Sequence, residues 1–136
     1  IDTTVISEIA DYYREIGETV DQRLPFVGSN FNVTRAGIHA DGMIKDEEIY
    51  NPFDTTTLLN RPPGVAITDK SGAAGLLMWL RKHRPAEAEG LDKRDPRVSR
   101  LLDVVTREFD GGRVTSLADE EVHHMVDDAF SPAGIA

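Results

Sequence analysis

The sequence contains no cysteine, no excess of basic residues and no long apolar run, and each absence excludes a class of protein. Without cysteine there is no disulfide framework, thiolate nucleophile or cysteine metal site, which is typical of the reducing cytoplasm. A net charge of −9 opposes binding to phosphate backbones. No apolar run approaches the roughly 18 residues of a membrane-spanning helix. We therefore expect a cytoplasmic protein that binds neither nucleic acid nor membranes.

The size and composition are those of one ordinary globular domain. The chain has 136 residues, of which 40% are hydrophobic and 29% are charged, so a buried core is possible. The first residue is Ile1 rather than methionine, and the opening residues lack the basic and apolar regions of a secretory signal. We therefore expect a fragment of a longer protein whose upstream part is missing.

Apolar residues recur with helical spacing in four parts of the sequence, which predicts a mostly α fold. The predicted helices cover about residues 3–16, 71–84, 95–110 and 116–130. Residues 64–68 predict one short strand. Between residues 18 and 63 the periodicity fades and proline and glycine recur, which predicts a long loop region. We expect a helix-plus-loop subdomain over residues 1–63 and a helical subdomain over residues 64–136.

The ends of the predicted helices carry residues that usually begin or stop a helix. Gly17 is expected to stop the first one. Ser71 and Ser116 are expected to cap the second and fourth, and Asp95 followed by Pro96 is typical of a helix start. Each helix is expected to bury its apolar stripe. In the first helix that stripe is Val5, Ile6, Ile9, Ala10, Tyr13 and Ile16.

The segment from Thr34 to Tyr50 carries the side chains best suited to chemistry. His39 has an imidazole that exchanges protons near neutral pH, and Tyr50 follows it with a polar phenol. Gly37 and Gly42 allow close turns on both sides of His39. Two interpretations remain open. His39 and Tyr50 are an acid-base pair, or they are a turn histidine bonded to backbone and a tyrosine that packs its ring beneath the loop.

No other motif in the sequence predicts a reaction centre. His83, His123 and His124 lack the spacing of metal ligands, so we interpret them as surface residues and expect no metal site built from this chain alone. There is no Walker pattern, dinucleotide fingerprint or Ser-His-Asp set.

Most of the sequence, from the helix before Pro25 to about Phe130, resembles a known family, and one short motif in it is specific. The run Gly-Ile-His-Ala-Asp-Gly over residues 37–42, followed by Tyr50 and by Ser71-Gly72 before a helix, is similar to the post-barrel region of the 2-isopropylmalate synthase, homocitrate synthase and citramalate synthase family. Ala40 stands where the common motif has glutamine, valine or lysine, which indicates an outlying branch such as a homocitrate synthase or Re-type citrate synthase relative. Nothing after Phe130 resembles the leucine-binding regulatory domain of full isopropylmalate synthases.

The resemblance implies a role in a larger enzyme of amino-acid biosynthesis. Members of this family join acetyl-CoA to a 2-oxo acid in a Claisen-type condensation, with a divalent metal (Mg, Mn or Zn) held in a TIM barrel. Their small domains reach across a dimer and supply a histidine and a tyrosine to the partner's site. His39 would be the catalytic histidine and Tyr50 its hydrogen-bonding partner. The partners would be the chain's own N-terminal barrel and a second protomer, and the isolated segment would be inactive.

The alternative is a stand-alone acidic helical module without catalytic activity, which binds a protein partner through residues 18–63. The two hypotheses differ in what they predict for the surface. A segment of a barrel enzyme is expected to expose an apolar patch where the rest of the enzyme covers it, whereas a stand-alone module is expected to have none.

Overall fold

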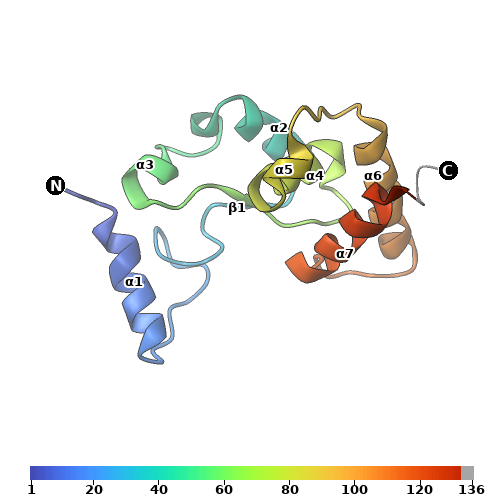
Figure 1. Cartoon of the computed structure of the whole chain (residues 1–136). Coiled ribbons are helices and arrows are strands. Elements are labelled where there is room, and N and C mark those ends of the chain that lie inside the picture. The colour runs from blue at the N-terminus through green and yellow to red at the C-terminus, as the bar shows by residue number, and fades with distance from the viewer. Residues whose placement is uncertain (133–136) are drawn as a thin grey trace. The chain divides into compact units, whose positions relative to one another are not determined.

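The fold of the chain is mostly α-helical, as the sequence predicted (Figure 1). The computed structural model describes residues 1–132, and at Glu47 the backbone only. The helices are α1 (Val5–Glu15), α2 (Gly37–Lys45), the 3-10 helix η1 (Glu47–Ile49), α3 (Thr55–Leu59), α4 (Gly72–His83), α5 (Pro85–Ala88), α6 (Pro96–Asp110) and α7 (Asp119–Phe130), and the strands are β1 (Val33–Thr34) and β2 (Gly64–Val65).

The chain forms two compact units, and the helix α2 contributes to both. Unit 1 contains Ile1–Thr34 and Gly42–Gly64, and unit 2 contains Arg35–Asp41 and Val65–Ala136. The strands β1 and β2 form a two-stranded sheet. The predicted strand over residues 64–68 is therefore only two residues long. Beyond it, Ile67 pairs with Leu117 as an isolated antiparallel bridge, because the Leu117 N–H donates to the Ile67 carbonyl at 2.9 Å.

In unit 1, α1 packs against α3 (Figure 1). The Ser7 hydroxyl is buried and donates to the Leu59 carbonyl at 2.5 Å. Helix α1 ends where predicted, because Gly17 has a φ of +87°, a conformation that glycine adopts without steric cost. The prediction of a buried apolar stripe on α1 was wrong. Of the six stripe residues only Ala10 is buried, and Ile9 at the middle of the stripe is 52% exposed.

The predicted loop between residues 18 and 63 contains α2, η1 and α3, so that prediction was wrong in part. Helix α3 starts at Asp54, whose side chain accepts a hydrogen bond from the Thr57 N–H at 3.0 Å. Polar contacts hold α3 to the segment that precedes β1. The buried Asn32 amide donates to the Arg61 carbonyl at 2.9 Å and to the Thr55 hydroxyl at 3.2 Å. Short helices escaped the sequence patterns because they are too short to show periodicity.

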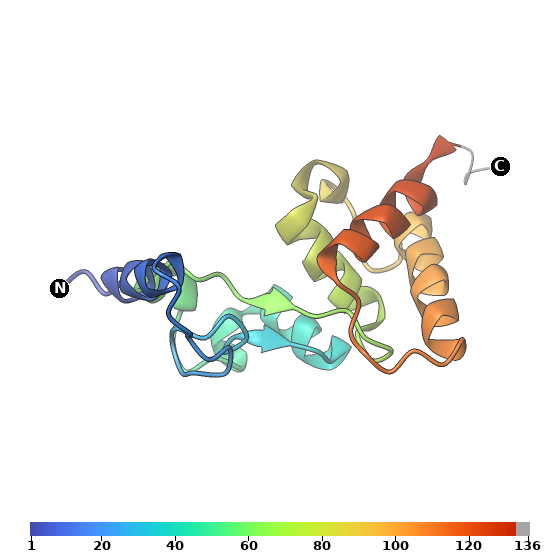
Figure 2. The same ribbon diagram turned by 90° about the horizontal axis from the view of Figure 1, so that it is seen from below.

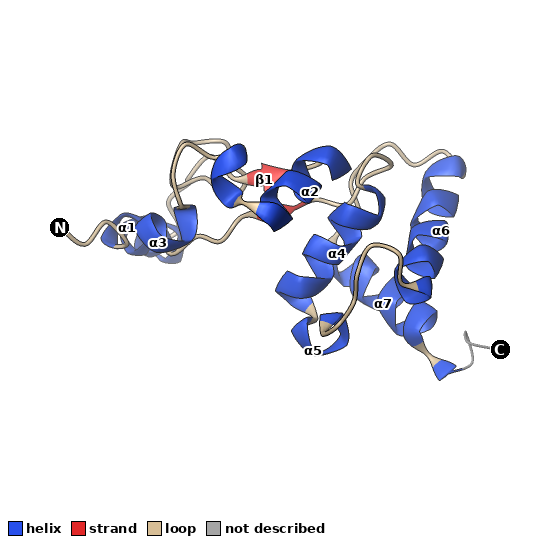
Figure 3. Cartoon of the chain, turned by 90° about the horizontal axis from the view of Figure 1, so that it is seen from above, coloured by secondary structure: helices blue, strands red, loops and turns tan. Residues whose placement is uncertain are grey.

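In unit 2, α6 packs against both α4 and α7, as Figures 2 and 3 show. The core between these helices is apolar and fully buried. Its members are Leu76, Leu77, Trp79, Leu80, Val98, Leu101, Val105, Val122 and Val126. Helix α6 begins as predicted, because the Asp95 side chain accepts from the Arg97 N–H at 2.9 Å and Pro96 opens the first turn.

Two predicted caps in unit 2 were wrong. Ser71 precedes α4, but its buried hydroxyl accepts from the Thr68 N–H at 2.8 Å and donates to the Ala66 carbonyl at 3.1 Å, so it fixes the preceding turn instead. Helix α7 begins after Ala118 rather than at Ser116. There the Glu121 carboxylate accepts from the Ala118 N–H at 2.8 Å, so it provides an acceptor for a backbone N–H at the start of the helix.

The helices that the structure describes are too short and too polar for any of them to cross a lipid bilayer.

Replacing Val98 with Ala should lower the free energy of unfolding by about 1.5–3 kcal/mol, because two methyl groups leave a fully packed site. Val98 is 0% exposed, whereas Val114 is 94% exposed. The same change at Val114 is the matched control and should stay within about 0.5 kcal/mol. Urea denaturation of both variants measures the difference. Equal effects at the two positions would contradict the packing of α6 described above.

Candidate functional site

His39 lies on the exposed side of α2, in a helix rather than in the predicted loop. The role predicted for Gly37 therefore also changes. The Gly37 N–H donates to the Lys70 carbonyl at 2.8 Å, and a Cβ at Gly37 would lie 2.3 Å from the Ser71 carbonyl oxygen. Gly37 thus allows the first turn of α2 to lie against the turn before α4. These contacts fix the start of α2, so Gly37 serves close packing here rather than a turn beside His39.

Asp41 lies two residues after His39 and forms an ion pair with the Lys93 side chain. This ion pair links α2 to the segment between α5 and α6. Leu91 in this segment is buried, so an ion pair and an apolar contact both hold the segment in place.

Tyr50 follows η1, and its ring lies directly against Gly42 of α2. A Cβ at Gly42 would lie 2.2 Å from the Tyr50 Cε2 atom, so only glycine leaves room for the ring. The Tyr50 side chain is nevertheless 43% exposed. One side of the ring is therefore packed while the rest faces solvent.

The structure holds the two predicted site residues at different places in the fold. His39 belongs to unit 2, in the first half of α2, and Tyr50 belongs to unit 1. Gly42 is three residues after His39, so Gly42 and His39 lie on the same side of α2. The side chains of His39 and Tyr50 are both exposed and therefore accessible to a ligand.

A cluster of aromatic and charged groups in unit 2 was missed by the sequence reasoning. His83 stacks on Trp79 with ring centroids 4.6 Å apart, and His123 packs edge-on against the same ring at 4.8 Å. The Trp79 indole N–H donates to Asp119 at 2.8 Å. Burial lowers the pKa of His83, while the Asp119 carboxylate, 3.9 Å away, opposes this shift.

The interpretation of His83 and His123 as surface residues was therefore wrong. The spacing of Trp79 and His83, four residues apart on one helix, was a signal for their stacking. The approach of His123 from α7 left no such signal. Trp79 is fully buried, so these rings belong to the packing of unit 2.

Throughout residues 1–132, no three His, Asp or Glu side chains are gathered so that they would hold a metal ion. The histidine rings that do meet are turned against Trp79 rather than toward a common point.

The chain was compared with known proteins. No protein-family model matches it. It is 48% identical over 128 residues to citrate (Re)-synthase of Syntrophus aciditrophicus (strain SB), a match that covers 93% of this chain and 20% of the relative. It is 44% identical over 124 residues to citrate (Re)-synthase of Clostridium kluyveri, covering 90% of this chain and 27% of the relative. It is 38% identical over 131 residues to 2-phosphinomethylmalate synthase of Streptomyces hygroscopicus, a match that covers 96% of this chain and 29% of the relative.

These relatives are condensing synthases, and this chain corresponds to their C-terminal region. The chain therefore matches the C-terminal region of these synthases, and the predicted resemblance to the post-barrel region of the 2-isopropylmalate synthase family is confirmed. The chain spans less than a third of the length of each relative, between 20% and 29%.

Replacing Gly42 with Ala should destabilise the chain by about 1–3 kcal/mol, because the new methyl group overlaps the Tyr50 ring. In a Tyr50→Ala background the same change should instead stabilise the chain by about 1 kcal/mol, because alanine favours a helix interior over glycine. Denaturant unfolding of the four proteins in this double-mutant cycle measures the coupling. If Gly42→Ala has the same effect in both backgrounds, Tyr50 does not occupy the space beside Gly42.

Proposed function

We propose that this chain is the C-terminal segment of an enzyme that condenses acetyl-CoA with a 2-oxo acid, and that it supplies His39 and Tyr50 to the barrel active site of a dimer partner. The observation that carries the proposal is the match to three condensing synthases over at least 90% of the chain. The match includes the segment that contains both residues, because only about a tenth of the chain lies outside it.

The names of the relatives narrow the substrate class. Citrate and 2-phosphinomethylmalate are both malates that carry an acidic group on a CH2 at carbon 2. Removing the two-carbon unit that acetyl-CoA contributes leaves, in each case, a 2-oxo acid with an acidic substituent on carbon 3. We therefore propose that the parent enzyme uses such a diacid, with oxaloacetate as the first to be assayed.

The reaction needs a group that moves protons near neutral pH. A proton leaves the methyl group of acetyl-CoA, and the resulting enolate carbon bonds to the keto carbon of the 2-oxo acid. The keto oxygen then takes up a proton, and water cleaves the thioester to release CoA. His39 is proposed to act in the first proton transfer or in activating the water, since an exposed imidazole suits both tasks.

Tyr50 is proposed to hydrogen-bond His39 or an oxyanion that forms during the reaction. Its packing supports this role, because a ring seated against the Gly42 backbone keeps its direction while its exposed side remains open to a ligand. A fixed donor stabilises developing charge without reorganising in the transition state.

The divalent metal is proposed to lie in the barrel, outside this chain. When bound there it would polarise the carbonyl of the 2-oxo acid. The isolated chain is therefore proposed to be inactive.

The exposed apolar face of α1 supports the proposal that a larger body covers this segment. Ile6, Ile9 and Tyr13 line an apolar groove of about 250 Å³ in unit 1, closed on its other side by Leu24 and Val27. A stand-alone module would not leave such a face in water. We propose that the rest of the synthase covers it.

In the parent enzyme, His39→Ala should lower turnover by about 10²–10⁴-fold, because a positioned acid or base contributes that much. Tyr50→Phe should lower it by about 10²–10³-fold if its phenol donates to an oxyanion. Binding of the 2-oxo acid, followed by calorimetry, should persist in both variants. His124→Ala, an exposed histidine on α7, is the matched control. Unchanged turnover in His39→Ala would remove His39 from the mechanism.

The isolated chain should bind a hydrophobic dye or self-associate, because its α1 face is exposed. Ile9→Lys should lower dye fluorescence, because it places a charge in the middle of the apolar groove. Val114→Lys is the matched control, since Val114 is 94% exposed and lies outside the groove. Fluorescence titration and sedimentation measure both properties. A monomeric chain that binds no dye would favour the stand-alone interaction module instead.

A further inference from the structure

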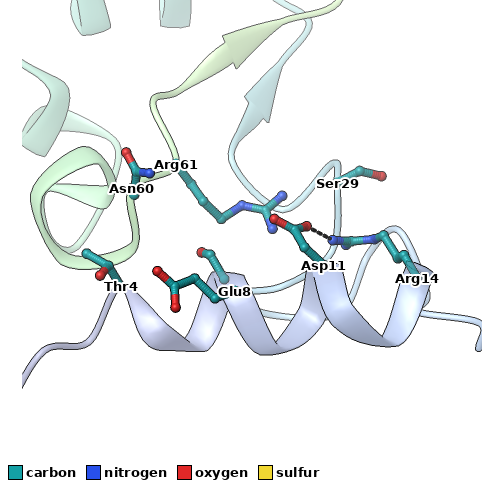
Figure 4. A pocket seen from close by; sticks show the side chains of 8 residues that line it. Thr4, Glu8, Asp11, Arg14, Ser29, Asn60 and Arg61 are labelled. Atoms are coloured by element: carbon teal, nitrogen blue, oxygen red, sulfur yellow. Dashed lines mark hydrogen bonds and ion pairs between the residues drawn. The ribbon is translucent and has the colours of Figure 1, made fainter. Parts of the chain in front are cut away.

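The polar side of α1 lines a second hollow, distinct from the apolar groove. Polar residues recur along α1 and its start every three or four positions, so they share one side of the helix. They are Thr4, Ser7, Glu8, Asp11 and Arg14. Together with Ser29, Asn60 and Arg61 they surround a hollow of about 390 Å³ within unit 1 (Figure 4). This volume is in the range of small-molecule sites, which begin at about 300 Å³.

The hollow contains two guanidinium groups, and only one of them is in an ion pair. The guanidinium groups of Arg14 and Arg61 both donate to the Val27 carbonyl, at 2.5 and 2.9 Å. Asp11 pairs with Arg14 at 2.8 Å, whereas Arg61 forms no ion pair with any residue among 1–132. Burial and the neighbouring Arg14 charge lower the pKa of Arg61. The Asp11 carboxylate opposes this shift, and an anion bound directly to the Arg61 guanidinium would favour its charged form further.

A negative charge in the same hollow is also unpaired. The Glu8 carboxylate makes no hydrogen bond and no ion pair within the part of the chain that the structure describes. Figure 4 shows the Arg61 side chain reaching over α1, the Asp11 side chain rising from α1 toward it, and the Glu8 side chain lying along α1 on the side of Thr4. The hollow therefore presents one unpaired cation and one unpaired anion to a common space.

We propose that this hollow binds a small zwitterion of the free α-amino acid class. The ligand carboxylate accepts from the Arg61 guanidinium, and the ligand ammonium donates to the Glu8 carboxylate. The Ser29 hydroxyl and the Asn60 amide line the same space and offer hydrogen bonds to the ligand. The proposal does not depend on the condensation reaction, because it rests only on residues of unit 1.

Ligands of a single charge fit the hollow less well. A simple anion would meet Arg61 but would also face the carboxylates of Glu8 and Asp11. A simple cation would meet Glu8 but would face two guanidinium groups. Only a ligand with both charges leaves each side chain beside an opposite charge, and like charges placed together weaken binding.

Calorimetric titration of this chain with alanine, propionate and ethylamine separates the two charges of the ligand, because the three differ only in the ammonium and carboxylate groups. Alanine and other free amino acids should bind with a Kd of about 1 mM or tighter. Propionate and ethylamine should each bind at least about tenfold more weakly, since each leaves one charged side chain without its partner.

Variants at Glu8 test the assignment of the ammonium site. Glu8 is exposed on α1, so its replacement leaves the fold intact, whereas Arg61 also holds the Val27 and Gly28 carbonyls. Glu8→Gln should weaken alanine binding by at least about tenfold. Glu15→Gln, an exposed residue of the same helix outside the hollow, is the matched control and should not change it. Glu8→Lys should reverse the preference, so that propionate binds more tightly than alanine.

Three outcomes would overturn the proposal. The first is that no amino acid in a panel of differing side chains gives heat at concentrations up to about 10 mM. The second is that propionate or ethylamine binds as tightly as alanine. The third is that Glu15→Gln weakens binding as much as Glu8→Gln does, because the effect would then come from net charge rather than from the hollow.

Discussion

The candidate site depends on two places where the backbone of α2 meets its neighbours without a side chain between them. At Gly37 the helix starts against the Ser71 carbonyl, and at Gly42 the Tyr50 ring occupies the space of a missing Cβ. Close packing of this kind fixes a helix in position, because any added atom must displace another. His39 lies between the two glycines, so its backbone is held at both ends. Such packing would suit the proton-transfer role that we propose for His39.

Helix α1 shows how one amphipathic pattern serves two surfaces. Its polar side contacts α3 through Ser7 and lines the charged hollow. Its apolar side, including Ile9 and Tyr13, remains exposed and forms a groove with the segment that follows. In most small domains the apolar side would face the core. In this chain polar contacts hold α1 to the rest of unit 1, and its apolar side is the face that we propose the rest of the synthase covers.

The sequence patterns predicted long helices well and short ones poorly. Helix α6 carries a clear apolar stripe and the Asp95 cap, and Val98, Leu101 and Val105 are buried as expected. The helices α2 and α3 lie in the predicted loop region, and α5 lies between two predicted helices. Their lengths are 9, 5 and 4 residues, which is too short for a 3.6-residue period to stand out. His123 and Trp79 lie on separate helices, so no pattern within one stretch of sequence predicted their contact.

The sequence by itself determined the resemblance to the condensing synthases and the identity of the candidate side chains. A motif of glycine, histidine and aspartate at fixed spacing can be recognised before any fold is known, because it needs only residue types in order. Tertiary structure alone decided what these residues contact. The Tyr50 ring lies against Gly42, Asp41 pairs with Lys93, and Arg61 donates to the Val27 carbonyl; the last two contacts join positions that are distant in the chain. Such long-range contacts depend on packing, and packing is not encoded in any local window.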